Sequence, residues 1–227
     1  QAQPLLEREL STVAFGKLAG RVRWNVGILR LDAIEFQQVG VDADLKDGGL
    51  QLQVGAENER LSADVELKPI GTEWQVTLKH KGKMDLADLI ARTTAGKDDS
   101  QAPLEIDVQL KGKGISLTEL LQSAEGRLLM VVGEGRLSES MAGYLPLGSV
   151  LYTLVNKLLP EGQKKQRGEL ECSVIQLDVA KGVATSSKGL ALRTDQINLI
   201  GGGALNLGTG EIDLRFKTAE RKGLGLN

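Results

Sequence analysis

Residues 169–218 read ELECSVIQLDVAKGVATSSKGLALRTDQINLIGGGALNLGTGEIDLRFKT. Apolar and polar residues alternate through most of this stretch, and Lys181-Gly182, Lys188-Gly189 and Thr209-Gly210 have the composition of tight turns. Alternation with a period of two predicts antiparallel strands with one apolar and one solvated face. The alternation shifts at Ser173-Val174, which predicts a β-bulge. The side chains expected on the apolar face are Leu170, Cys172, Ile175, Leu177, Val179, Leu190, Leu192, Ile197, Leu199, Leu205, Leu207, Ile212, Leu214 and Phe216.

The same alternation occurs earlier in the chain. The turn signal Asp47-Gly48-Gly49 predicts a hairpin, and the connections are too short for crossover helices. The strands should therefore form an antiparallel meander. Apolar residues at every second position predict these strands at 22–28, 39–45, 50–54, 61–67, 74–78, 104–110 and 128–132.

Three helices are expected among the strands. One short helix spans about 85–91, and another begins at Ser116, with Glu119 completing a capping box. A longer apolar helix is expected at about 138–159, with Pro146 inside it as the site of a kink or break. Residues expected along its apolar face include Met141, Tyr144, Leu145, Leu151, Tyr152, Val155 and Leu158.

These elements predict a mainly β fold built on a curled antiparallel sheet, either groove-like (taco-like) or sandwich-like. An antiparallel sheet with one apolar face must cover that face with helices, a second sheet or a ligand. The polar segment 93–102 is the expected boundary between a β-meander at 1–95, which ends in a short helix, and a second half at 96–227. A single continuous domain is the alternative.

The composition excludes several classes of function. The net charge of -2 gives no basic footprint for nucleic acid, and only 3% of the residues are aromatic. One histidine and one cysteine are too few for a metal site built from such residues. No run of 18 apolar residues occurs that would predict a membrane-spanning helix.

The residues that usually carry catalysis have ordinary structural interpretations here. His80 lies between Lys79 and Lys81 and is expected on a solvated face, and Asp98-Asp99 is expected in a turn. Cys172 shares its parity with Leu170, so we expect it on the apolar face rather than as a nucleophile beside histidine. The sequence therefore predicts no enzyme, no catalytic residue, no metal and no cofactor.

The glycines at 201–203 are not a phosphate-binding loop. No Lys-Ser/Thr follows them, and they do not open a helix. Glycines inside a strand instead predict a bulge, a bend, or a position that another backbone or a ligand approaches closely.

Several segments together resemble a known family. EIDVQLKGKGISLTELLQSAEGRLLMVVGEGRL at 105–137 is followed by ECSVIQLDVAKGVATSSKGLAL at 171–192 and INLIGGGALNLGTGEIDLRF at 197–216. The order of these parts resembles the C-terminal region of the AsmA family of Gram-negative envelope proteins. LKDGGLQLQVGAENERLSADVELKP at 45–69, followed by a DLADLI helix, is similar to that family more loosely.

The resemblance implies a periplasmic, non-enzymatic protein whose apolar β-groove carries phospholipid acyl chains between the inner and outer membranes during outer-membrane biogenesis. The apolar residues at 170–216 would line the groove. The helix at 138–159 would cap the groove or contact a membrane surface, or would pack into the sheet as core. The resemblance also implies an inner-membrane anchor absent from this chain, and envelope proteins as possible partners.

Two other interpretations stay open at this level. A structural or assembly module would dock partner proteins through its sheet edges without binding lipid. A hydrolase with dispersed carboxylates is the third interpretation.

Overall fold

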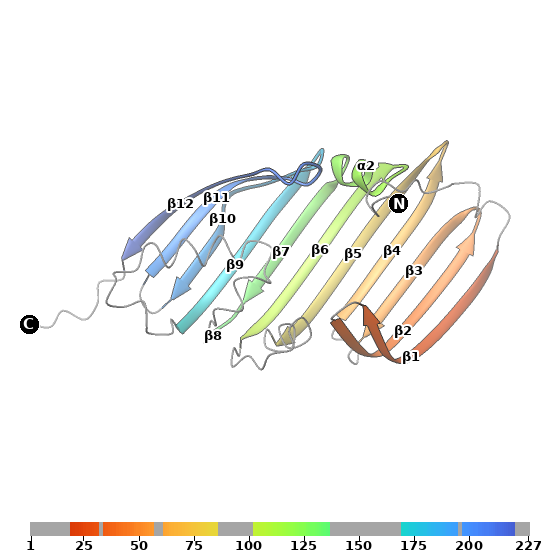
Figure 1. The fold of residues 1–227 in the computed structure, drawn as a ribbon, viewed down its shortest axis with the longest axis horizontal. Coiled ribbons are helices and arrows are strands. Elements are labelled where there is room, and N and C mark those ends of the chain that lie inside the picture. Colours follow the sequence, from red (N-terminus) through yellow and green to blue (C-terminus); the bar gives the residue numbers. More distant parts are fainter. Residues whose placement is uncertain are drawn as a thin grey trace, which may run out of the picture.

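The computed structural model describes residues 19–31, 34–56, 61–85, 102–136, 169–194 and 197–220. These residues form one antiparallel β-sheet and one short helix (Figure 1). The prediction of a mainly β fold is confirmed. The helix is α2 (Leu117–Gln122), and the strands are β1 (Gly20–Leu31), β2 (Ile34–Lys46), β3 (Gly49–Ala56), β4 (Leu61–Ile70), β5 (Glu73–Asp85), β6 (Pro103–Gly114), β7 (Glu125–Val132), β8 (Gly135–Arg136), β9 (Glu169–Ala180), β10 (Val183–Thr194), β11 (Ile197–Asn206) and β12 (Ile212–Glu220).

The sheet is an antiparallel meander whose strands pair in chain order, except that β7 pairs with β9 and not with β8. Its order is β1-β2-β3-β4-β5-β6-β7-β9-β10-β11-β12, and β8 pairs only with β9. Two expected turns are confirmed as two-residue hairpins with positive φ at both positions: Asp47-Gly48 (52° and 75°) and Lys181-Gly182 (50° and 72°). β5 pairs with β6 from Trp74 to Asp85, so the strands on either side of the expected domain boundary belong to one sheet.

The register places apolar side chains on one face of the whole sheet. Residues opposite each other on neighbouring strands share a face. One such row joins Val108, Leu128 and Leu177 across β6, β7 and β9. Another joins Val65, Leu78 and Leu110 across β4, β5 and β6. We call this apolar side of the sheet the inner face and the opposite side the outer face.

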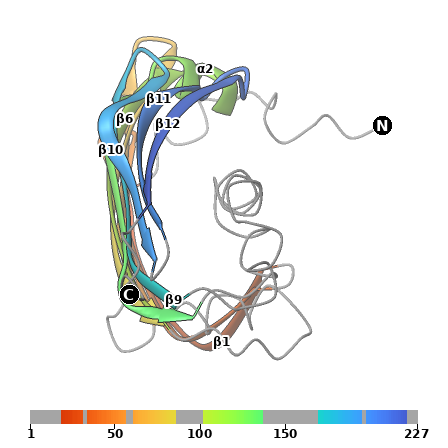
Figure 2. The same ribbon diagram turned by 90° about the vertical axis from the view of Figure 1, so that its left-hand side faces the viewer.

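The inner face is the concave one. The strands bend along their length, so the sheet is C-shaped when viewed from its end, and α2 lies on the concave side (Figure 2). Gly112 and Gly114 share the parity of Leu110. A Cβ at Gly112 would overlap the carbonyl oxygen of Leu120 in α2, and one at Gly114 would overlap the side chain of Glu119. The helix therefore packs on the inner face, where glycine allows it to approach the strand.

The sheet is not closed. β1 and β12 are the two ends of the strand order, and each pairs with a single described strand. A barrel or a second packed sheet is not present among the described strands. The described part of the chain is thus a single curved layer with two free edges.

The expected start of the short helix is confirmed. The Oγ of Ser116 accepts a hydrogen bond from the backbone N–H of Glu119 at 3.2 Å. The Glu119 carboxylate accepts from the backbone N–H of Ile115 at 2.8 Å, one residue before the position that a capping box usually serves. The first bond satisfies an N–H group that the helix leaves without an intrahelical partner, and the second ties the residue before the cap to the first turn.

Two local predictions in the C-terminal strands are wrong. Lys188-Gly189 is not a turn, because β10 continues through it with a bulge in which Ser186 Oγ accepts from the Gly189 N–H at 2.8 Å. The bulge expected at Ser173-Val174 lies instead at Glu171, since Leu170 pairs with Thr194 and Cys172 pairs with Arg193. This extra residue moves Cys172 to the face opposite Leu170.

Two expected helices cannot be compared with the structure. The short helix at about 85–91 and the longer apolar helix at about 138–159 lie outside the described residues, apart from Asp85, which ends β5. The longer helix is therefore not borne out, and α2 is the one helix of the described part of the chain.

Candidate functional site

The candidate site is the inner face itself. Every described strand on the path from β1 to β12 turns aliphatic or aromatic side chains toward it at alternate positions. Among the strand residues on the inner face whose side chains are described, His80 is the one that is ionisable. The face can bind apolar matter over a large area, without directional chemistry.

Two clusters of buried residues lie on this face. Val39, Ala56 and Leu61 form the centre of the N-terminal cluster. Met84 packs against both clusters, so the apolar surface is continuous between them. The C-terminal cluster comprises Ala102, Leu104, Ala124, Met130, Val132, Leu170, Ile175, Leu177, Val179, Ala184, Leu190, Leu192 and Leu199.

Most of the residues predicted to line the apolar face do lie on it. Leu205, Leu207, Leu214 and Phe216 are half-buried, and Ile212 is 50% exposed on the edge strand β12. The side chain of Ile197 is not described. The predicted residues that are buried, each at most 8% exposed, are Leu170, Ile175, Leu177, Val179, Leu190, Leu192 and Leu199.

Cys172 is the exception. It pairs with Arg193, whose guanidinium forms an ion pair with Glu171, so it belongs to the outer face. The expectation that it shares the apolar face with Leu170 is wrong because parity alone does not detect the extra residue in β9.

The N-terminal strands also contribute to the inner face, although the predicted lining contains none of their residues. Leu52, Val65 and Leu78 are half-buried there, and Trp24 is 60% exposed on the edge strand β1. The sequence could have indicated them, since apolar and polar residues alternate with a period of two in these strands as they do in the C-terminal strands. The resemblance directed the predicted lining to residues 170–216 alone.

The predicted role of the three glycines is confirmed. Gly202 lies beside the β10 bulge, where an added Cβ would overlap the Ser186 carbonyl oxygen. On the inner face, Gly201 pairs with Phe216 and Gly203 with Leu214. A side chain at either position would collide with β12, so the glycines allow β12 to pack closely on β11.

His80 lies on the inner face, contrary to the prediction of a solvated outward position. Its register partners are Ala63 of β4 and Val108 of β6, and its Nδ1 lies 2.7 Å from the carbonyl oxygen of Ser62. The prediction relied on the flanking lysines, Lys79 and Lys81. Those lysines are on the outer face because neighbours along a strand point to opposite sides.

The outer face is polar and carries cross-strand ion pairs. Lys83 lies 2.8 Å from Glu105 and Lys81 lies 3.4 Å from Asp107. On β1 and β2, the hydrogen bonds that Arg21 and Arg23 donate hold the pKa of the Asp42 carboxyl below its ordinary value. Exposed pairs of this kind add little stability.

No constellation for catalysis or metal binding is found among the described residues. They contain no group of three or more His, Cys, Asp or Glu side chains that could hold a metal ion. His80 and Cys172 point to opposite faces and lie three strands apart, at least about 14 Å at the usual strand spacing, with a further offset along β9. They cannot act together as a nucleophile and its base.

The residues expected to cap the apolar face or contact a membrane all lie outside the described residues. They are Met141, Tyr144, Leu145, Leu151, Tyr152, Val155 and Leu158. Within the described ranges, no helix has the length and apolar character to cross a bilayer.

The main feature of the described sheet is thus its inner face, which is apolar from β1 to β12. No protein-family model, curated protein or solved structure matches the chain.

Proposed function

We propose that this chain binds phospholipid acyl chains along the inner face of its sheet. One observation carries the proposal: the inner face is apolar from one free edge to the other, while the charged residues lie on the outer face. A sheet whose only purpose was a packed core would be expected to close on itself or to meet a second sheet. An apolar face that no second sheet covers among the described residues suits a ligand with no polar groups along its length.

The dimensions and energies favour such a ligand. Ten spacings of about 4.8 Å between eleven strands make the face about 48 Å wide across the strands. An acyl chain spans half of the roughly 30 Å hydrocarbon core of a bilayer, so several chain lengths fit across the strands. Each buried CH₂ contributes about 0.8 kcal/mol, which needs no catalytic or directional group.

The accessible part of the face is its middle and N-terminal region. Leu199 and Leu170 are each 1% exposed and belong to the packed C-terminal cluster. In contrast, Val65, Leu78 and Leu128 are half-buried. We therefore place the first contacts of an acyl chain on strands β3 to β7, with the C-terminal strands as the packed base of the sheet.

The resemblance to the AsmA family supplies the cellular context of the proposal. It supports a periplasmic protein, anchored in the inner membrane by a segment outside this chain, that channels phospholipid toward the outer membrane. In this proposal the segment 138–159 caps the inner face or contacts a membrane surface. The chemistry needed is binding and release, with no bond made or broken.

Native mass spectrometry with lipid extraction tests binding directly. The purified 227-residue protein should retain phospholipid. A photoreactive residue placed at Leu52 or Leu78, on the inner face, should form an adduct with the lipid, whereas one at the neighbouring Gln53 or Lys79, on the outer face, should not. A lipid-free protein with no adduct at either inner position would overturn the proposal.

The free edges favour a second candidate function, docking of envelope proteins by β-augmentation. β1 and β12 each pair with one described strand, and they expose Trp24 (60%) and Ile212 (50%). The carbonyl oxygens of Asp213 and Arg215 point toward β11, so the N–H groups of Ile212 and Leu214 face the free edge of β12. A stable complex with a partner protein, formed without lipid and abolished by proline at Ile212 or Leu214, would favour this function. Retained lipid together with no effect of either proline would speak against it.

A further inference from the structure

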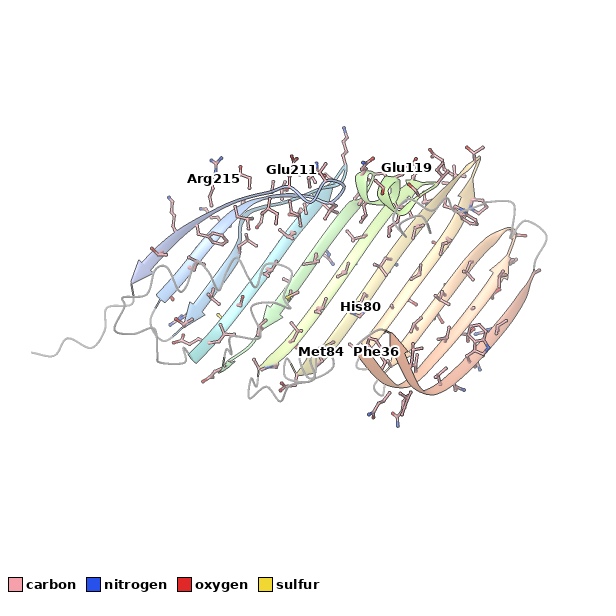
Figure 3. The ribbon with its side chains drawn as sticks, viewed as in Figure 1. Phe36, His80, Met84, Glu119, Glu211 and Arg215 are labelled. Carbon is pink, nitrogen blue, oxygen red and sulfur yellow. The ribbon has the colours of Figure 1, made fainter. Side chains whose placement is uncertain are left out.

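His80 is an ionisable residue in the middle of the apolar inner face (Figure 3). From the adjacent strands, Ala63 and Val108 face it. Along its own strand, Leu78 and Gly82 share its side of the sheet, and the ring lies beside Gly82, where an added Cβ would be 3.2 Å from Nε2. The surroundings of the ring on this face are therefore apolar.

The hydrogen bond of His80 determines which ring nitrogen faces the apolar surface. The Ser62 carbonyl, 2.7 Å from Nδ1, can only accept, so Nδ1 carries a proton in the neutral ring. Nε2 is then unprotonated and can be covered by apolar matter at modest cost. Protonation keeps the bond to Ser62 and adds an N–H and a positive charge at Nε2.

The charged groups nearest to His80 do not compensate that charge on the inner face. On β5, Lys79 and Lys81 point to the outer face, and so do Asp64 of β4 and Asp107 of β6 by their register. Lys81 and Asp107 already form an ion pair there. Among the described residues, no acidic side chain of these three strands faces the ring from the inner side.

We propose that protonation of His80 weakens the binding of acyl chains to the inner face, so that lipid is held at neutral or mildly basic pH and released on acidification. The inference rests on the proposed function. An acyl chain lying across β4, β5 and β6 covers Nε2, and covering an unpaired charge carries a large desolvation cost, whereas covering the neutral ring carries much less. Imidazole is the side chain whose charge ordinarily changes between about pH 5 and about pH 8.

The direction in which the lipid affinity changes on acidification distinguishes release by His80 protonation from recognition of an anionic headgroup by His80. A headgroup phosphate bound to the imidazolium would make the affinity rise on acidification. The geometry favours the opposite sign, because the sheet positions around His80 provide no second donor on this face for an anion.

The test measures the affinity of the whole chain for a phosphatidylcholine with one pyrene-labelled acyl chain, a probe whose headgroup keeps its charge between about pH 5.5 and about pH 8. We expect the wild-type affinity to fall roughly tenfold or more between the higher and the lower pH. In His80→Gln, whose amide can still donate to the Ser62 carbonyl, the ratio of the two affinities should be close to one. His80→Leu serves as a second variant that does not titrate.

Lys79→Gln is the matched control, because it removes a charge from the adjacent residue on the outer face and should keep the wild-type ratio. A wild-type affinity that does not change with pH, that rises on acidification, or that falls equally in His80→Gln would overturn the inference while leaving lipid binding intact. Absence of binding at both pH values in all four proteins would overturn the proposed function, and the inference with it. Circular dichroism at both pH values shows that the compared proteins are folded.

Discussion

The ring of Phe216 on β12 lies over Gly201 on β11, on the inner face of the sheet. A Cβ at Gly201 would overlap Cδ1 of Phe216 and would lie 2.6 Å from the carbonyl oxygen of Arg215. Gly201 is buried although it carries no side chain. The glycine thus provides the space in which the edge strand packs its one aromatic ring among the described residues of β12.

Substitution of Gly201 by valine should displace β12. The extra methyl groups overlap a ring and a backbone carbonyl, and overpacking of this kind costs about 1–3 kcal/mol of folding free energy. Urea unfolding measures the change. Gly27→Val on β1, where no atom lies within 4 Å of an added Cβ, is the control and should cost less than about 1 kcal/mol. Equal losses in the two variants would show that the ring does not depend on the glycine.

The packed and accessible parts of the inner face should respond differently to truncation. Leu199 is 1% exposed in the C-terminal cluster, whereas Ile212 is 50% exposed on the edge strand. We expect Leu199→Ala to lower the free energy of unfolding by about 2–5 kcal/mol and Ile212→Ala to lower it by less than about 1 kcal/mol. Chemical denaturation with both variants tests this. A small effect at Leu199 would mean that the C-terminal strands also form an accessible surface.

The pattern of the sequence predicts the sheet well, because burial on one face forces a period of two. The rows through Val108 and Leu177, and through Leu78 and Leu110, follow directly from it. The turn at Asp47-Gly48 was equally predictable, since positive φ at two positions favours such residues.

The predictions that failed assigned a side chain to the wrong face of the sheet, either because of an extra residue in the strand or because of the residues next to it. Cys172 changes face because Glu171 is a bulge, and a bulge can be placed at several positions without altering the composition of the strand. His80 was assigned to the solvent from its lysine neighbours, although in a strand neighbours face opposite sides. A curled sheet was predicted, but whether its face is covered by a second sheet or left as a single layer depends on the whole sheet, so no local pattern specifies it.

The Arg21–Asp42–Arg23 cluster should give the fold a dependence on acidic pH. Hydrogen bonds from Arg21 and Arg23 lower the pKa of Asp42 in the folded protein. A carboxyl with a lowered folded-state pKa adds stability above its unfolded-state pKa, about 3.9, and this stability is lost as the pH falls through the folded-state value. The stability difference between wild type and Asp42→Asn should therefore shrink below about pH 4.

Thermal unfolding of the wild type and Asp42→Asn between about pH 3 and about pH 7 measures this difference. The double variant Arg21→Gln, Arg23→Gln is the control, because it removes the donors that lower the pKa and should reduce the same pH dependence. A difference that stays constant down to the lowest pH would show that the carboxylate gains nothing from its arginines in the folded state.

Ser123 should hold α2 on the inner face. Its Oγ accepts from the Lys113 N–H at 2.7 Å and lies 2.6 Å from the Lys113 carbonyl oxygen, to which it donates. Ser123→Ala removes both bonds between the end of the helix and β6, and should cost about 1–3 kcal/mol because backbone groups lose their partners. Hydrogen exchange at the Lys113 amide should accelerate in the variant.

Ser62→Ala, which removes a longer 3.4 Å bond on the outer face, is the matched control and should leave that amide protected. α2 packs on Gly112 and Gly114 at one end of the inner face, so under the proposed function the pyrene-labelled lipid should also dissociate faster from Ser123→Ala than from the control. Unchanged exchange at Lys113 would show that the packing of α2 against the glycines, and not the serine, holds the helix in place.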